Sequence, residues 1–84
     1  MINYAEVLTE DERLRAINYF DENIELFKES EFVASILRSH KNNSKLDINL
    51  KRRALIEYWL DKILDDERIS KNIKKKVAKY KAVI

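Results

Sequence analysis

Apolar residues recur every three or four positions along most of this chain, with charged residues between them. The pattern is clearest in residues 69–84, which read ISKNIKKKVAKYKAVI. On a helix of 3.6 residues per turn, this spacing gathers the apolar residues into one narrow stripe. The segment therefore predicts a helix, capped by Ser70, that packs one edge against the protein and is cationic elsewhere. The stripe residues are Ile69, Ile73, Val77, Tyr80 and Ile84.

The first long helix is predicted to begin at Thr9. Thr9 and Glu12 form a Thr-x-x-Glu capping box, which is a signature of helix N-termini. A core-facing stripe then predicts a helix that ends near residues 28–30. Before it, residues 1–8 are expected to form either a short turn capped by Asn3 or a frayed tail. The stripe residues of the first helix are Leu14, Ile17, Phe20, Ile24 and Phe27.

Two further helices are expected in the middle of the chain. Ser30 is expected to cap a short second helix, and the sequence HKNNSKL predicts a loop over residues 40–46. A third helix, predicted over residues 48–66, is apolar on nearly half its circumference and should be the most buried. Its tryptophan, Trp59, is either a core residue or, if exposed, an anchor for a partner.

The composition favours helices over strands. The 84 residues include no Gly, no Pro and no Cys. The chain therefore lacks the usual hairpin turns, helix breakers and disulfides. We predict an all-α protein with one domain spanning residues 1–84, folded as an antiparallel four-helix bundle.

The sequence also bears on the cellular location of the protein and on how its charge is distributed. The first eight residues contain Glu6 and no basic start, so no signal peptide is expected, and every apolar run is too short to cross a bilayer. We therefore expect a cytoplasmic protein. Residues 1–36 hold nine acids and three bases, a net of −6, whereas residues 37–84 hold six acids and fourteen bases, a net of +8. The two halves either attract each other within one bundle or present a charged interaction face.

Residues that support catalysis or cofactor binding are scarce. His40 is the sole histidine, and its place on the apolar edge of a short helix indicates a structural role. One histidine without cysteines cannot make a usual zinc site, and no Gly-rich loop is present to hold a phosphate. We expect no enzyme activity, no catalytic residues, no metal site and no cofactor.

The basic last helix is the best candidate for a binding surface. Three partners remain open for it: an acidic protein, an anionic membrane surface at the inner face, or nucleic acid. The nucleic-acid alternative corresponds to a small phage-type regulatory protein. The candidate partner-binding residues are Lys71, Lys74, Lys75, Lys79 and Lys81.

The order of these elements resembles that of the immunity proteins of class IIa (pediocin-like) bacteriocins, the enterocin A immunity family. The similarity extends in outline over residues 9–84 and begins with the acidic first helix. It continues through SILRSHKNNSKL, through LKRRALIEYWLDKIL in the long third helix, and through the Ser-capped, Lys-rich segment ISKNIKKKVAKYKAVI.

This resemblance implies a cytosolic antiparallel four-helix bundle that protects a bacteriocin-producing cell. Its implied partner is the mannose phosphotransferase permease that carries the bound bacteriocin. Members of the family use their C-terminal half to determine which bacteriocin is recognised. The resemblance therefore implies that the lysines of the last helix contact the partner.

Overall fold

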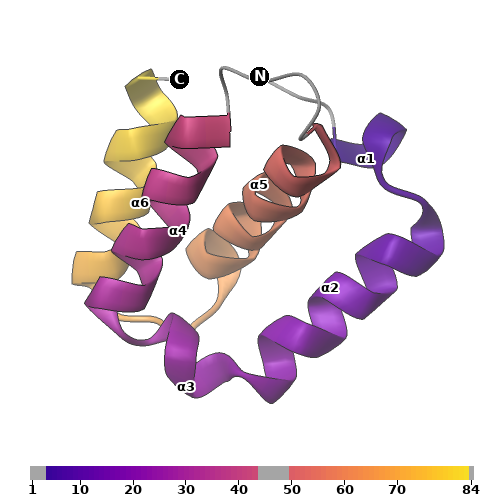
Figure 1. The fold of residues 1–84 in the computed structure, drawn as a ribbon. Helices are drawn as coiled ribbons and strands as arrows, with labels where there is room; N and C mark the ends of the chain where they lie inside the picture. The colour runs from indigo at the N-terminus through magenta and orange to yellow at the C-terminus, as the bar shows by residue number, and fades with distance from the viewer. Residues whose placement is uncertain (1–3, 44–49, 84) are drawn as a thin grey trace.

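The computed structural model of this protein describes residues 4–43 and 50–83. These residues form helices and no strand, which confirms the all-α class (Figure 1). The helices are α1 (Tyr4–Val7), α2 (Glu10–Glu22), α3 (Ile24–Phe27), α4 (Ser30–Asn43), α5 (Leu50–Asp65) and α6 (Lys71–Val83).

Helix α5 lies at the centre of the arrangement and contacts α1, α2, α4 and α6. Helices α4 and α6 lie side by side and run opposite to α5, whereas α2 runs in the same general direction as α5 (Figure 1). The short helix α3 joins α2 to α4, and from that corner α2 and α4 diverge across the face of α5 (Figure 1). Residues of α2, α4 and α5 together line an open groove, described below.

The core forms where α4, α5 and α6 meet and where the α2–α3 corner closes over them. Helix α5 contributes Leu60 and Ile63, which have no exposed surface, as expected for the helix predicted to be most buried. Within the described part of the chain, no helix combines the length and the apolar character needed to span a membrane. The core cluster comprises Phe20, Phe27, Val33, Ile36, Leu37, Ile56, Leu60, Ile63, Ile69, Ile73 and Val77.

Two predicted helix starts are confirmed. The Thr9 hydroxyl accepts a hydrogen bond from the Glu12 backbone N–H at 3.1 Å, and the Glu12 carboxylate accepts one from the Thr9 N–H at 2.9 Å. This reciprocal pair satisfies two backbone donors that the helix itself leaves open. At the other end of the chain, the Ser70 hydroxyl accepts from the Ile73 N–H at 3.4 Å, and Ile69 is buried just before it.

The prediction of one continuous helix from Thr9 to residues 28–30 is wrong, because the helix is interrupted at Asn23. The Asn23 side-chain amide donates to the Tyr19 carbonyl oxygen at 2.9 Å, and its backbone leaves the helical region with φ −115° and ψ 29°. Asn competes with helical hydrogen bonds in this way through its short polar side chain. The interruption turns Ile24–Phe27 into the separate helix α3.

The expected burial of Leu14 is also wrong, since 56% of its surface is exposed. Helix α2 instead buries Ala16 and Phe20, which lie four residues apart on one face. At 100° per residue, Leu14 lies 200° from Ala16 and therefore on the opposite side of the helix. The spacing of apolar residues alone did not show which side of α2 packs against α5.

The second helix is longer than predicted, and the loop assigned to residues 40–46 is wrong for residues 40–43. Helix α4 begins at Ser30 itself and continues to Asn43, which is 14 residues. Its last turns are held by tertiary contacts of His40, described below, that outweigh the local turn preference of the asparagines. The rest of that loop, residues 44–46, lies outside the described residues, as do Asn3 and Ile84.

Candidate functional site

The part of the predicted stripe that the structure describes faces the core, with Tyr80 half-buried, and three lysines lie on the opposite side of α6. Ile73 and Val77 are in the core, whereas Lys71, Lys75 and Lys79 are exposed. We call these three residues the lysine row, because a spacing of four residues places their Cα atoms about 6 Å apart along one line of the helix. Within the described residues, the lysine row makes no ion pair.

The other two candidate lysines lie beside acidic groups. Lys81 forms an ion pair with Asp61 on α5. Lys74 is half-buried near Asp66. The hydrogen bond from Arg68 lowers the pKa of Asp66, and the charge of Lys74 lowers it further. The structure therefore divides the five predicted residues into an uncompensated row of three and two that neutralise acids of the protein itself.

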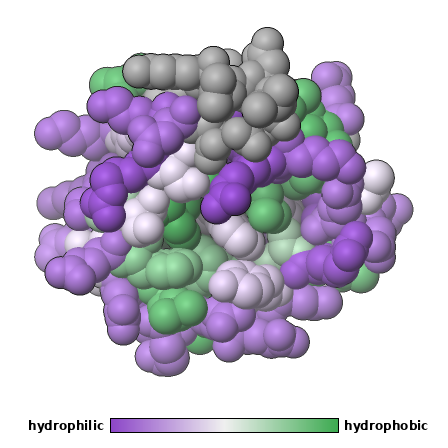
Figure 2. All heavy atoms as spheres, in the orientation of Figure 1, coloured by the Kyte–Doolittle hydropathy of each residue, from purple (hydrophilic) through white to green (hydrophobic). Residues whose placement is uncertain are grey.

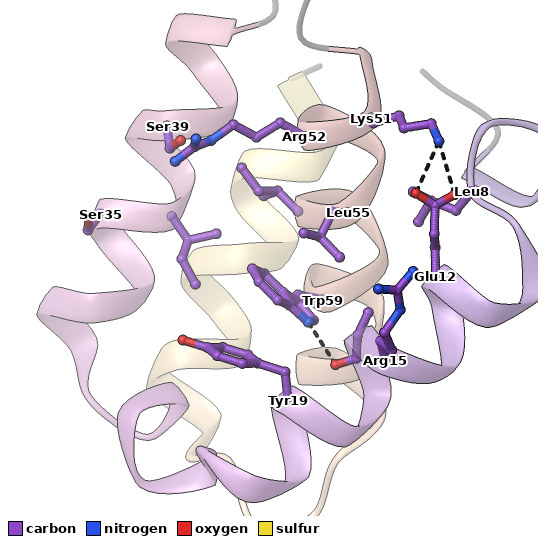
Figure 3. Close-up of a pocket in the computed structure, with 13 residues that line it drawn as sticks. Leu8, Glu12, Arg15, Tyr19, Ser35, Ser39, Lys51, Arg52, Leu55 and Trp59 are labelled. Carbon is purple, nitrogen blue, oxygen red and sulfur yellow. Dashed lines mark hydrogen bonds and ion pairs between the residues drawn. The ribbon is translucent and has the colours of Figure 1, made fainter.

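A second surface, which the sequence analysis did not predict, is a groove between α2 and α4 with α5 as its floor. The groove has a volume of about 740 Å³ and is open to the outside (Figure 3). In the space-filling view, apolar atoms lie in the middle of this face between hydrophilic flanks (Figure 2). We call it the α2–α4 groove. It is lined by Leu8, Glu12, Arg15, Ala16, Tyr19, Ser35, Ile36, Ser39, Lys51, Arg52, Leu55, Ile56 and Trp59.

Trp59 forms one end of the groove floor and is held on several sides. Its indole N–H donates to the Ala16 carbonyl oxygen of α2 at 3.1 Å (Figure 3). Its ring stacks on Tyr19 with centroids 5.3 Å apart and meets the edge of Phe27 at 5.6 Å. The half-buried Trp59 therefore fixes α2 to α5 and still presents ring surface to the groove.

The rim of the groove carries more positive than negative charge. The Lys51 ammonium donates to both carboxylate oxygens of Glu12, at 3.1 and 3.2 Å. A hydrogen bond from the Thr9 backbone N–H, together with the one from Lys51, lowers the pKa of Glu12 to about 2. Arg15 pairs with Asp11, four residues before it on α2, at 3.1 Å, and both side chains are exposed. Arg52 makes no ion pair with any described residue and extends across the groove towards Ser39 (Figure 3).

A buried polar cluster lies between α4, α5 and α6. His40 is 2% exposed, and its Nδ1 lies 2.6 Å from the Tyr80 hydroxyl oxygen. Its Nε2 lies 3.8 Å from Oε1 of Glu57, which is 3% exposed. In the tautomer with the proton on Nε2, Tyr80 donates to Nδ1 and the ring N–H faces the carboxylate. These contacts explain why a histidine stands at a core position and support its structural role.

Burial makes this histidine resist protonation. Desolvation is the main cause, and the positive charge of Arg53 adds to it, so the pKa of His40 lies below its ordinary value of 6.5. Burial and the negative charge of Glu57 raise the pKa of Tyr80 in turn. Both groups are therefore neutral near pH 7, and the hydrogen bond between them is one between neutral partners.

Residues 4–43 and 50–83 contain no group of three or more His, Cys, Asp or Glu side chains placed to hold a metal ion. The comparisons with protein-family models, with curated proteins and with solved structures found no significant match to this chain.

The sequence signal that would have located the groove lies in α5. Its apolar residues, which include Leu55, Ile56, Trp59 and Leu60, cover nearly half of its circumference, and Arg52 lies in its first turn. Both features were visible, but only the splay of α2 shows that part of the face is open. The lysine row and the α2–α4 groove are thus the two candidate binding surfaces.

Proposed function

We propose that this protein is a non-enzymatic binding protein of the bacteriocin immunity type. In this proposal it is a cytoplasmic four-helix bundle that protects the producing cell by docking on the receptor permease with its bound bacteriocin. The observation that carries the binding role is the lysine row. The specific partner comes from the resemblance in the order of the helices.

The energetics of the lysine row favour an acidic partner. Lys71, Lys75 and Lys79 are exposed on a helix whose opposite edge is anchored in the core, so their positions are fixed relative to the fold. A complementary acidic surface would gain three charge contacts without breaking an ion pair between described residues. Such complementarity contributes mainly to specificity and association rate. Taken in chain order, the long helices α2, α4, α5 and α6 run in alternating directions, which supports the proposed four-helix bundle (Figure 1).

Expression in a bacteriocin-sensitive strain tests the proposal. We expect the protein to raise tolerance to one pediocin-like bacteriocin, and the triple variant Lys71→Glu/Lys75→Glu/Lys79→Glu to lose the protection. Among single variants, Lys75→Glu should weaken protection, whereas Arg38→Glu should not. Arg38 is exposed on α4, and its reversal changes the net charge by the same amount. Absence of protection against a panel of such bacteriocins would reject the immunity function.

The uncompensated charge of the lysine row also favours a second candidate, a small regulatory protein that binds nucleic acid. Phosphate contacts by lysines predict DNA or RNA binding that weakens steeply as salt rises. Gel-shift measurements at low salt should then show binding that is lost in Lys74→Glu/Lys75→Glu/Lys79→Glu. No shift with any DNA or RNA at low salt would eliminate this candidate.

A further inference from the structure

The α2–α4 groove is a largely apolar surface that residues 4–43 and 50–83 leave open. Leu55 and Trp59 are half-buried on α5 and point into the groove, and Tyr19 is exposed beside them on α2 (Figure 3). The buried side chains of Ile36 on α4 and Ala16 on α2 also line the groove. Concave apolar surfaces with a few polar groups at the edge are the usual form of binding sites.

The rim charges restrict what can fill the groove. Three cations line it, Arg15, Lys51 and Arg52, against the single acid Glu12. Glu12 is already engaged by Lys51 and by the capping hydrogen bond to Thr9. The Arg15–Asp11 pair is highly exposed, and such surface pairs contribute little, so Arg15 is available to another carboxylate. The rim is therefore complementary to an anionic occupant.

The position of Arg52 is the strongest argument for an anionic occupant of the groove. It lies in the first turn of α5 (Leu50–Asp65), where the helix dipole is positive and a cation is unfavourable. Lys51 in the same turn is compensated by Glu12, but Arg52 has no ion pair with the described residues. Its side chain lies over the groove near Ser39 rather than away from it (Figure 3). A carboxylate entering the groove would compensate both the dipole and the guanidinium.

The dimensions of the groove suit a short helix. From Lys51 to Trp59 the floor helix rises about 12 Å, which is a little more than two helical turns. Two flanking helices with an apolar floor form the type of groove that receives an amphipathic helix. We propose that the α2–α4 groove binds an acidic amphipathic helix of a partner protein, with its apolar side chains on Leu55 and Trp59 and its carboxylates on Arg52 and Arg15.

This proposal is independent of the lysine row, because no residue of that row lines the groove. The test uses the intact protein and the intrinsic signal of Trp59, the only tryptophan in the chain. The probe is a synthetic helical peptide of about four turns with Leu and Phe on one face and Glu on the other. Its counterpart carries Lys in place of every Glu.

The Glu peptide is expected to change the fluorescence of Trp59 and to shift its indole N–H signal in NMR spectra, with weaker binding at higher salt. Arg52→Glu should lower the affinity about tenfold, and Leu55→Ala should lower it without altering the salt dependence. Arg38→Glu changes the net charge as much as Arg52→Glu does, and Arg38 is exposed outside the groove lining, so this variant should leave the affinity unchanged. Circular dichroism verifies that each variant remains folded.

Three results would overturn the proposal. One is equal binding of the Glu and Lys peptides, and another is an unchanged affinity in Arg52→Glu. The third is self-association of the peptide-free protein in sedimentation experiments that Arg52→Glu abolishes, because it would assign the groove to a second copy of this chain. If the Lys75→Glu variant loses bacteriocin protection but still binds the peptide, the lysine row and the α2–α4 groove have separate binding roles.

Discussion

Phe27 joins three helices through its aromatic ring. Its side chain has no exposed surface, although it lies on α3, a helix of only four residues. The ring centroid lies 4.6 Å from that of Phe20 on α2, 5.1 Å from Phe32 on α4 and 5.6 Å from Trp59 on α5. A fourth ring, Tyr19, meets it edge-on at 6.4 Å. The corner from which α2 and α4 diverge is therefore built around this one side chain.

The Phe27→Ala substitution should remove about 3–5 kcal/mol of stability, because it deletes a fully buried ring and leaves a cavity. We place the value near the upper end, since four neighbouring rings each lose a contact of about 0.5–1.5 kcal/mol. A domain has only about 5–15 kcal/mol in total. At about 4–8 °C per kcal/mol for a chain of this size, the Tm should fall by at least about 12 °C.

Urea unfolding followed by circular dichroism and by Trp59 fluorescence measures this change. Leu26→Ala is the matched control, because Leu26 precedes Phe27 on α3 but is 37% exposed. The control should lose less than about 1 kcal/mol. A loss below about 1.5 kcal/mol for Phe27→Ala, or equal losses for both variants, would refute the conclusion that this ring anchors the corner.

Two further predictions concern pH and capping. Burial and the charge of Arg53 hold the pKa of His40 below 6.5, so the unfolded chain binds a proton first and stability should fall as the pH drops below about 6.5. Urea midpoints measured between about pH 5 and 7.5 should depend less steeply on pH in His40→Gln than in the unmodified protein, and equal slopes would contradict the assignment. The Thr9→Ala substitution should cost about 1 kcal/mol in thermal unfolding by removing the α2 cap. Thr9→Ser should retain most of that stability, and an equal loss in both variants would show that the hydroxyl is not the stabilising group.

Local signals predicted the helical class and two helix starts correctly. The capping box of Thr9 and Glu12 and the cap of Ser70 are contained within four residues each, so the sequence specifies them without knowledge of the fold. The apolar stripe of α6 was also readable, since Ile73 and Val77 leave only one edge of that helix to bury. In each case the interaction is local or the apolar edge is narrow.

The errors arose where distant residues determine the outcome. Leu14 fits a helical stripe, but the partner face of α5 meets Ala16 and Phe20 instead. The residues after His40 favour a turn, yet helix α4 continues to Asn43. His40 in this segment contacts Tyr80, which lies forty positions further along the chain. Helix propensities differ by less than about 1 kcal/mol per residue, so such tertiary contacts prevail.

The sequence by itself determined that this protein is helical, where two of its helices are capped, and that lysines cover the outer side of the last helix. Each of these follows from residue spacing within a few turns. Only the tertiary structure decided that Lys71, Lys75 and Lys79 form no ion pair with the described residues, whereas Lys81 pairs with Asp61. It alone decided that α2 splays from α4 and opens the groove, because helix angles depend on how side chains from different segments pack around Phe27 and Trp59.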